Sequence, residues 1–268
     1  MQNSIEPRQT KITARLAAQG AMIEEIRVLV PVIRPESARV DARRAILDDN
    51  ILRRPSLGSR EKVFAKLSTR YFRADTPQSV ARFVRAMQKA TDPVQGGLFS
   101  YLMLLWNDAL VFLLGCEWLP AKFKTSSFSA ETRDIEIELE RLSKQSPEIK
   151  RWTKITRNRA AQHYLGLLRD FGYATGSVRK LLKRPFISPG VVLFGAQLIV
   201  GGGESVGGLP DHLIFKAMGL SVKDVISAFT ELREQGLVEF AIQGGVTHFN
   251  VRNEVTKDDH CIAETSRA

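Results

Sequence analysis

The run Gly97–Gly115, GLFSYLMLLWNDALVFLLG, limits the folds open to this chain more than any other stretch. It is apolar enough to require burial, and its nineteen residues are about what a helix needs to cross a membrane. However, Asn107 and Asp108 lie near its centre, and an aspartate at the middle of a bilayer costs about 2.5–3.5 kcal/mol. Its flanks also lack a one-sided cluster of positive charge. We therefore expect a buried core helix, with a membrane span as the alternative.

Much of the remaining chain shows helical periodicity, with apolar residues recurring at spacings of three and four. Helices are expected over Leu16–Val30, Ala38–Leu47, a stretch from Gly58 through Tyr71, Thr76–Ala90, Glu131–Leu142, and a stretch capped by Thr153 or Thr156 that runs to about Phe171. Thr76 is the expected cap of its helix. The chain is therefore predicted to be mainly α and multi-helical.

The C-terminal part follows the element order of a winged helix, which is a helix-turn-helix variant. The two helices are expected over Pro210–Met218 and Ser221–Gln235. The strands are expected over Leu237–Gln243 and Val246–Val251, joined by Gly244-Gly245 as a small β-hairpin wing. The second helix carries a net charge of −1, which favours packing or protein binding over DNA reading. The glycine tract 201–208 lacks phosphate-loop spacing and is expected to be a linker or turn.

Positive charge is concentrated in two stretches of the chain. The net charge of +10 favours a polyanionic partner, nucleic acid first and an anionic membrane surface second. Ala38–Arg73 holds ten Lys and Arg against four Asp and Glu, and Lys150–Arg184 holds ten against Asp170 alone. The net positive charge of the second stretch nearly equals that of the whole chain. The positive charge is therefore localised, and it predicts two basic surfaces.

The first basic surface is expected at a helix-turn-helix corner that ends in a helix N-terminus, where free N–H groups favour an anion. Gly58 is the expected N-cap, with Glu61 at N3. Basic residues then recur four apart along one face of the helix. The residues predicted to contact phosphate here are Arg53, Arg54, Ser56, Ser59, Arg60, Lys62, Lys66 and Arg70.

The second basic surface is expected at the first turns of the helix that ends near Phe171. Cations there oppose the helix dipole, and a bound anion would resolve that conflict. The residues predicted to contact phosphate are Thr153, Lys154, Thr156, Arg157, Asn158 and Arg159. The alternative for both surfaces is a solvated face whose Lys and Arg stems cover the edge of the core.

The sequence gives little support to other classes of site. The cysteines, Cys116 and Cys261, lie far apart, and no Cys and His residues have zinc-ligand spacing, so neither a metal nor another cofactor is expected. Cys116 is expected to be buried and inert. No nucleophile motif, phosphate loop or small-molecule substrate is evident, which argues against an enzyme. Few cysteines and no signal peptide fit a reducing cytoplasm.

Two groups of motifs point to a known family. The first is Asp49-Asn50-Ile51-Leu52-Arg53-Arg54, followed by Ser56 and Ser59 ahead of a basic helix. The second is Trp152-Thr153-Lys154-Ile155-Thr156-Arg157, leading to Gly172-Tyr173 and Ile187-Ser188-Pro189. Over about Ile23 to Val200 the chain resembles the BrxA family of BREX phage-defence systems. It departs from the family at Pro55–Ser59, where members often have Arg-Ser-Pro-x-Thr.

The resemblance implies a mainly helical, non-enzymatic protein that binds double-stranded DNA. It also implies helix-turn-helix-like units and a core similar to the antitermination protein NusB. The segments predicted are a helix-turn-helix-like unit (1–75), a central apolar core (76–128), a second basic helix-turn-helix-like unit (129–200), and a winged-helix-like C-terminal unit with its tail (201–268).

The predicted function is double-stranded DNA binding within a BREX-type system, with other BREX proteins as further partners and no membrane. Phosphate contacts position a protein without reading bases, so we expect weak sequence preference and steep salt dependence. One alternative is an RNA-binding protein, although Phe64, Tyr71, Tyr164 and Phe171 fall on apolar faces and leave Trp152 as the aromatic that could be exposed. The other alternative is a scaffold, which would dock proteins through the acidic helix Glu131–Leu142 or through the C-terminal unit.

Overall fold

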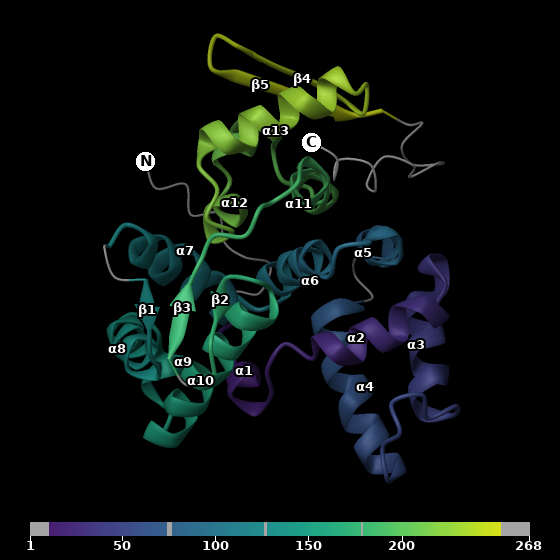
Figure 1. Cartoon of the computed structure of the whole chain (residues 1–268), viewed down its shortest axis with the longest axis vertical. Coiled ribbons are helices and arrows are strands. Elements are labelled where there is room, and N and C mark those ends of the chain that lie inside the picture. Colours follow the sequence, from purple (N-terminus) through teal and green to yellow (C-terminus); the bar gives the residue numbers. More distant parts are fainter. Residues whose placement is uncertain (1–10, 74–76, 126–127, 178, 253–268) are drawn as a thin grey trace.

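A computed structural model describes residues 11–73, 77–125, 128–177 and 179–252. Most of these residues lie in helices, which confirms the mainly α prediction. The helices, labelled in Figure 1, are α1 Arg15–Ala18, α2 Ile23–Leu29, α3 Ala38–Leu47, α4 Leu57–Tyr71, α5 Pro77–Lys89, α6 Pro93–Asn107, α7 Ala109–Phe123, α8 Thr132–Ser143, α9 Pro147–Lys150, α10 Lys154–Asp170, α11 Pro189–Gly201, α12 Leu213–Ala217 and α13 Val222–Glu234. Short 3-10 segments are η1 Val30–Val32, η2 Pro35–Ser37 and η3 Val206–Asp211. The strands are β1 Ser129–Ala130, β2 Ala174–Thr175, β3 Lys180–Leu182, β4 Val238–Gln243 and β5 Val246–Val251.

The long apolar run folds into a corner. α6 ends at Asn107, α7 begins at Ala109, and the two helices are bent by 109°. The carboxylate of Asp108 accepts hydrogen bonds from the N–H groups of Leu110 and Val111, at 3.0 and 3.2 Å. The expected single helix was therefore wrong, because Asp108 satisfies the first free N–H groups of a new helix.

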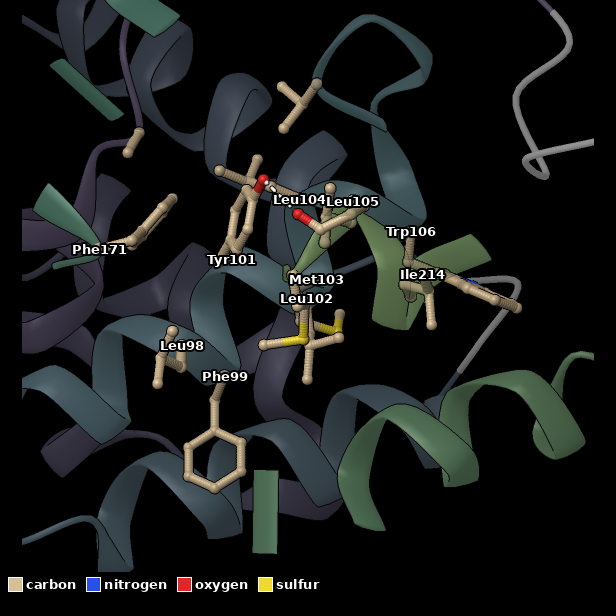
Figure 2. Packing of buried hydrophobic residues seen from close by; sticks show 14 of the residues in the cluster. Leu98, Phe99, Tyr101, Leu102, Met103, Leu104, Leu105, Trp106, Phe171 and Ile214 are labelled. Atoms are coloured by element: carbon tan, nitrogen blue, oxygen red, sulfur yellow. Dashed lines mark hydrogen bonds between the residues drawn. The ribbon is translucent and has the colours of Figure 1, made fainter. Parts of the chain in front are cut away.

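The expected burial of this run is confirmed. Every residue of α6 from Gly96 to Asn107 is buried, and Figure 2 shows its side chains packed between Phe171 on one side and Ile214 on the other. The hydroxyl of Tyr101 donates to a main-chain carbonyl of α12 at 3.2 Å. No single helix in the described ranges is long and apolar enough to cross a membrane, and α6 with α7 meets that test only as a bent pair.

The buried carboxyl group of Asp108 at this corner makes the stability of the protein depend on pH. Asp108 is 4% exposed, and burial raises its pKa above the usual value. The folded state therefore keeps a proton that the unfolded state loses, so this group lowers stability as the pH rises above about 4. Asp108→Asn keeps the oxygen that caps α7 and is expected to be at least as stable as the wild type near neutral pH.

Asp108→Ala removes both the charge and the cap, so it is expected to be about 1 kcal/mol less stable than Asp108→Asn. Urea unfolding of the three proteins at mildly acidic and mildly basic pH measures both differences. A gap between the wild type and Asp108→Asn that does not change between the two pH values would contradict the buried-charge argument.

The helix expected over Leu16–Val30 is interrupted between α1 and α2. Gln19 is extended, and Met22 has a positive φ of 60°. The cause lies in α4, where the guanidinium of Arg70 donates to the main-chain carbonyls of Gln19 and Gly20, at 2.6 and 2.5 Å. These carbonyls therefore bond to another element instead of continuing the helix.

Helices α3 and α4 pack against each other on the right-hand side of Figure 1. α3 has the predicted bounds. α4 begins at Leu57 because the hydroxyl of Ser56 accepts a hydrogen bond from the N–H of Ser59 at 3.2 Å. The prediction that Gly58 is the N-cap was therefore wrong. Thr76, the expected cap of α5, lies outside the described residues.

Helices α8, α9 and α10 form the left-hand side of Figure 1. α8 starts one residue later than predicted and runs to Ser143. The hydroxyl of Thr153 accepts from the N–H of Thr156 at 3.2 Å, so Thr153 caps α10. β3 pairs antiparallel with both β1 and β2 in a small sheet that the sequence pattern did not predict.

The C-terminal part has the predicted order of elements. η3 and α12 occupy the first predicted helix, α13 the second, and β4 pairs with β5 through Gly244-Gly245, whose φ angles are both positive. Phe240 and Phe249 lie opposite each other in the hairpin and pack against Phe229 of α13. The assignment of this unit as a winged helix stays a prediction.

One hydrophobic cluster extends from Leu16 in α1 to Phe249 in β5. It includes residues from each of the four predicted segments, whose boundaries stay a prediction. Because protein cores pack densely and deform little, this shared core fixes the two basic surfaces relative to each other.

Candidate nucleic-acid interface

The corner between α3 and α4 presents Arg53 and Lys62 to solvent, and neither side chain has a partner among the residues that the structure describes. The loop that carries Arg53 has a defined conformation. Asn50 and Arg53 have φ angles of 49° and 50°, and the Asn50 side chain bonds the N–H and the carbonyl of Arg54 at 2.8 and 3.1 Å. A cation on such a loop has little backbone freedom left to lose when it meets an anion.

Other predicted residues of this cluster contact the protein itself. Arg54 forms an ion pair with Glu25 at 2.8 Å, and Arg60 donates to the carbonyl of Leu47 at 2.8 Å. Lys66 donates to a side chain of the α1–α2 connection at 2.6 Å. All three cations are half-buried, and each gives at least one of its N–H donors to a group within the fold.

Arg70 does not belong to a solvent-facing surface, which corrects the sequence prediction. It is 5% exposed, and its donors reach the carbonyls of Gln19 and Gly20. Ser56 uses its hydroxyl oxygen to cap α4, and Ser59 lies half-buried one turn further on. Their hydroxyl hydrogens remain available to a phosphate oxygen, whereas the guanidinium of Arg70 does not.

The second cluster is divided in the same way. Lys154 and Arg159 are exposed and without a side-chain partner within the described ranges. Arg157 forms an ion pair with a carboxylate of α8, and Asn158 donates to another at 2.9 Å. The hydroxyls of Thr153 and Thr156 bond each other at 3.0 Å. The acidic face of α8 therefore offsets part of the positive charge at the start of α10, so a bound anion is not needed there.

The structure keeps the two clusters apart. In Figure 1, α1 lies between α4 and α10. α1 packs against α10, while Arg70 ties the chain just after α1 to α4. A ligand that met both clusters would have to extend across α1, which suits a long polyanion better than a small anion.

Three exposed cations of α3 were not among the predicted site residues. Arg39, Arg43 and Arg44 are all exposed, and their side chains have no partner in the part of the chain that is described. Arg39 and Arg43 are four residues apart and therefore share one face of the helix. Their spacing in ARVDARRAIL was the signal that could have identified them.

The described residues contain no group of three or more His, Cys, Asp or Glu placed to hold a metal ion. Cys116 is buried, as predicted, and burial raises the pKa of its thiol to about 12. A thiol with so high a pKa is a poor nucleophile near neutral pH. Cys261 lies outside the described residues.

Residues 11–195 of the chain match the model of a protein family described as BrxA. The match covers 185 of the 268 residues. This is the family that the sequence motifs resemble. The match includes both clusters and ends within α11, so α12, α13 and the hairpin lie beyond it. No curated protein matches the chain, and no solved structure matches it.

Proposed function

Because this chain belongs to the BrxA family and is therefore a BREX-associated protein, we propose that it binds double-stranded DNA through phosphate contacts. The proposal includes a non-enzymatic role, a cytoplasmic location, and other BREX proteins as partners. The sequence supports the non-enzymatic role, since it contains no nucleophile motif and no phosphate loop.

The observation that carries the proposal is a group of exposed cations on α3, the following loop and α4, which have no side-chain partner among the described residues. Four of its members, Arg39, Arg43, Arg53 and Lys62, are the proposed phosphate contacts. Duplex DNA carries one negative charge about every 1.7 Å along its axis, so cations spread over a corner of this kind can each meet a phosphate. Contacts of this type orient a protein on DNA without distinguishing bases.

The exposed face of α13 supports a minor role for base reading. It presents Asp224, Glu231 and Glu234 against Lys223 and Arg233. A helix with this charge balance meets repulsion from a phosphate-lined groove. We therefore propose weak sequence preference for the protein as a whole.

The test is fluorescence anisotropy with a labelled random duplex at several salt concentrations, beside a single-stranded RNA of equal length. Phosphate contacts from Arg39, Arg43, Arg53 and Lys62, together with those from Lys154 and Arg159, would give a slope of log affinity against log salt concentration of roughly −5. Absence of duplex binding even at low salt would refute the proposal. Tighter binding of the RNA would favour an RNA-binding protein, and binding of neither would favour a protein scaffold.

A further inference from the structure

A groove of about 710 Å³ opens between α8 and the start of α10. Small-molecule sites in proteins usually measure about 300–1,000 Å³. Trp152, in the connection between α9 and α10, and Ile137 of α8 supply its apolar lining. Trp152 is half-buried and packs against the core, so one part of the indole is held by the protein while the rest faces the groove.

Positive charge surrounds this apolar lining. Lys144 and Lys154 line the groove, are exposed, and have no side-chain partner in the described chain. Arg157 reaches from α10 to Glu140 on α8, and its Nε is buried without a hydrogen-bond partner in that same part of the chain. The groove therefore combines an aromatic ring with cations that are free to receive an anion.

We propose that this groove binds a nucleotide unit, with the base against the indole of Trp152 and the phosphate at Lys144 and Lys154. A planar base offers the π-face that stacks on tryptophan, and its phosphate supplies the anion. The nucleotide must be unpaired, because a base inside a duplex is stacked and has no free face. The inference therefore goes beyond duplex binding and does not depend on it.

The carboxylates in the groove fit the same ligand. Glu140 is paired with Arg157, and Glu136 accepts from Asn158 at 2.9 Å and lies 3.6 Å from Arg133. Their charge is thus offset, and their remaining lone pairs can accept from an exocyclic amine of a base. An adenine nucleotide satisfies all three features, namely the ring, the carboxylates and the cations.

Tryptophan fluorescence of the full chain, titrated with AMP, tests the inference. Trp106 and Trp118 are 6% and 7% exposed, so quenching by a stacked base reports mainly on Trp152. AMP is expected to quench the fluorescence saturably, while adenosine alone and inorganic phosphate alone quench it weakly.

Lys144→Ala together with Lys154→Ala should weaken the AMP response about tenfold. Trp152→Phe keeps a ring and should retain AMP binding by calorimetry, whereas Trp152→Ala should weaken it about tenfold.

Two DNA probes distinguish the source of the nucleotide. In the first outcome, a duplex with a single-stranded overhang binds more tightly than its blunt counterpart, and Trp152→Ala abolishes the difference. This result supports the site and assigns it to an unpaired DNA end. AMP binding without an overhang preference supports the site and assigns it to a free nucleotide. Blunt-duplex affinity, measured in the same series, tests phosphate binding separately.

No AMP quenching and no overhang preference, with the variants folded, would overturn the inference. Quenching by an acidic amphipathic peptide but not by AMP would overturn it too, because it would identify the groove as a protein-docking surface.

Discussion

Arg70→Met is expected to lower the free energy of unfolding by about 3 kcal/mol, although the sequence pattern predicted Arg70 to be a phosphate contact. The guanidinium satisfies the carbonyls of Gln19 and Gly20 at 2.6 and 2.5 Å, in a site that is 5% exposed. Methionine fills a similar volume but donates no hydrogen bond, so the carbonyls of Gln19 and Gly20 both lose their partner. Urea unfolding measures the loss directly.

Two control variants separate this role from charge. Arg70→Lys keeps the charge but lacks the planar fork that reaches two carbonyls, so its loss should be intermediate. Arg43→Met removes an exposed cation of α3 and should change stability by less than about 0.5 kcal/mol. If Arg70→Met kept wild-type stability and lost DNA affinity, Arg70 would be a solvent-facing phosphate contact, contrary to the structure.

Changing Arg39, Arg43, Arg53 and Lys62 together to alanine is expected to weaken duplex binding about a hundredfold at moderate salt. Each phosphate contact that is lost removes about 0.9 from the slope of log affinity against log salt, so the slope should fall by roughly 3 to 4. Because these four side chains are exposed and unpaired within the described chain, the unfolding midpoint should stay close to that of the wild type.

A matched variant controls for net charge. Lys124, Lys183, Lys216 and Lys223 are also exposed and lie away from α3 and α4, and their replacement by alanine lowers the net charge from +10 to +6, as the first set does. This control should keep most of the duplex affinity. Equal losses in both variants would mean that overall charge, and not the corner, drives binding.

Helix positions were well predicted where local signals act. α3 has the predicted bounds, the cap of α10 is one of the two residues proposed, and the hairpin turn is formed by the predicted glycine pair. These features depend on residues close in sequence, as caps and tight turns do. The break between α1 and α2 could not be predicted in this way, because it depends on Arg70, about fifty residues further along the chain.

The error over Arg70 has a geometric origin. Positions four apart on a helix are displaced by about 40° at each step, because one turn takes 3.6 residues. From Lys62 to Arg70 the displacement reaches about 80°, which brings Arg70 to within about 20° of the azimuth of Val63. The structure follows that progression, since Lys62 is exposed, Lys66 half-buried and Arg70 buried. Spacing alone therefore overstated how far one basic face extends.

The same limit explains the second cluster. Arg157 and Asn158 were correctly placed near the start of α10, but their partners are acids of α8 on a different element. Net charge counted along one stretch does not register an opposing stretch that packs against it. The exposed cations of α3 were overlooked for the converse reason. Asp41, the acid within that helix, is buried and pairs with Arg34, so Arg39 and Arg43 face no carboxylate in the described part of the chain.

The contact that holds the α1–α2 break has a consequence for evolution. Arg70 binds main-chain carbonyls, which are present whatever side chains occupy positions 19 and 20. Substitutions at those two positions can accumulate without a compensating change at position 70. A co-variation analysis of aligned relatives should therefore find position 70 nearly fixed as arginine yet coupled to no other column.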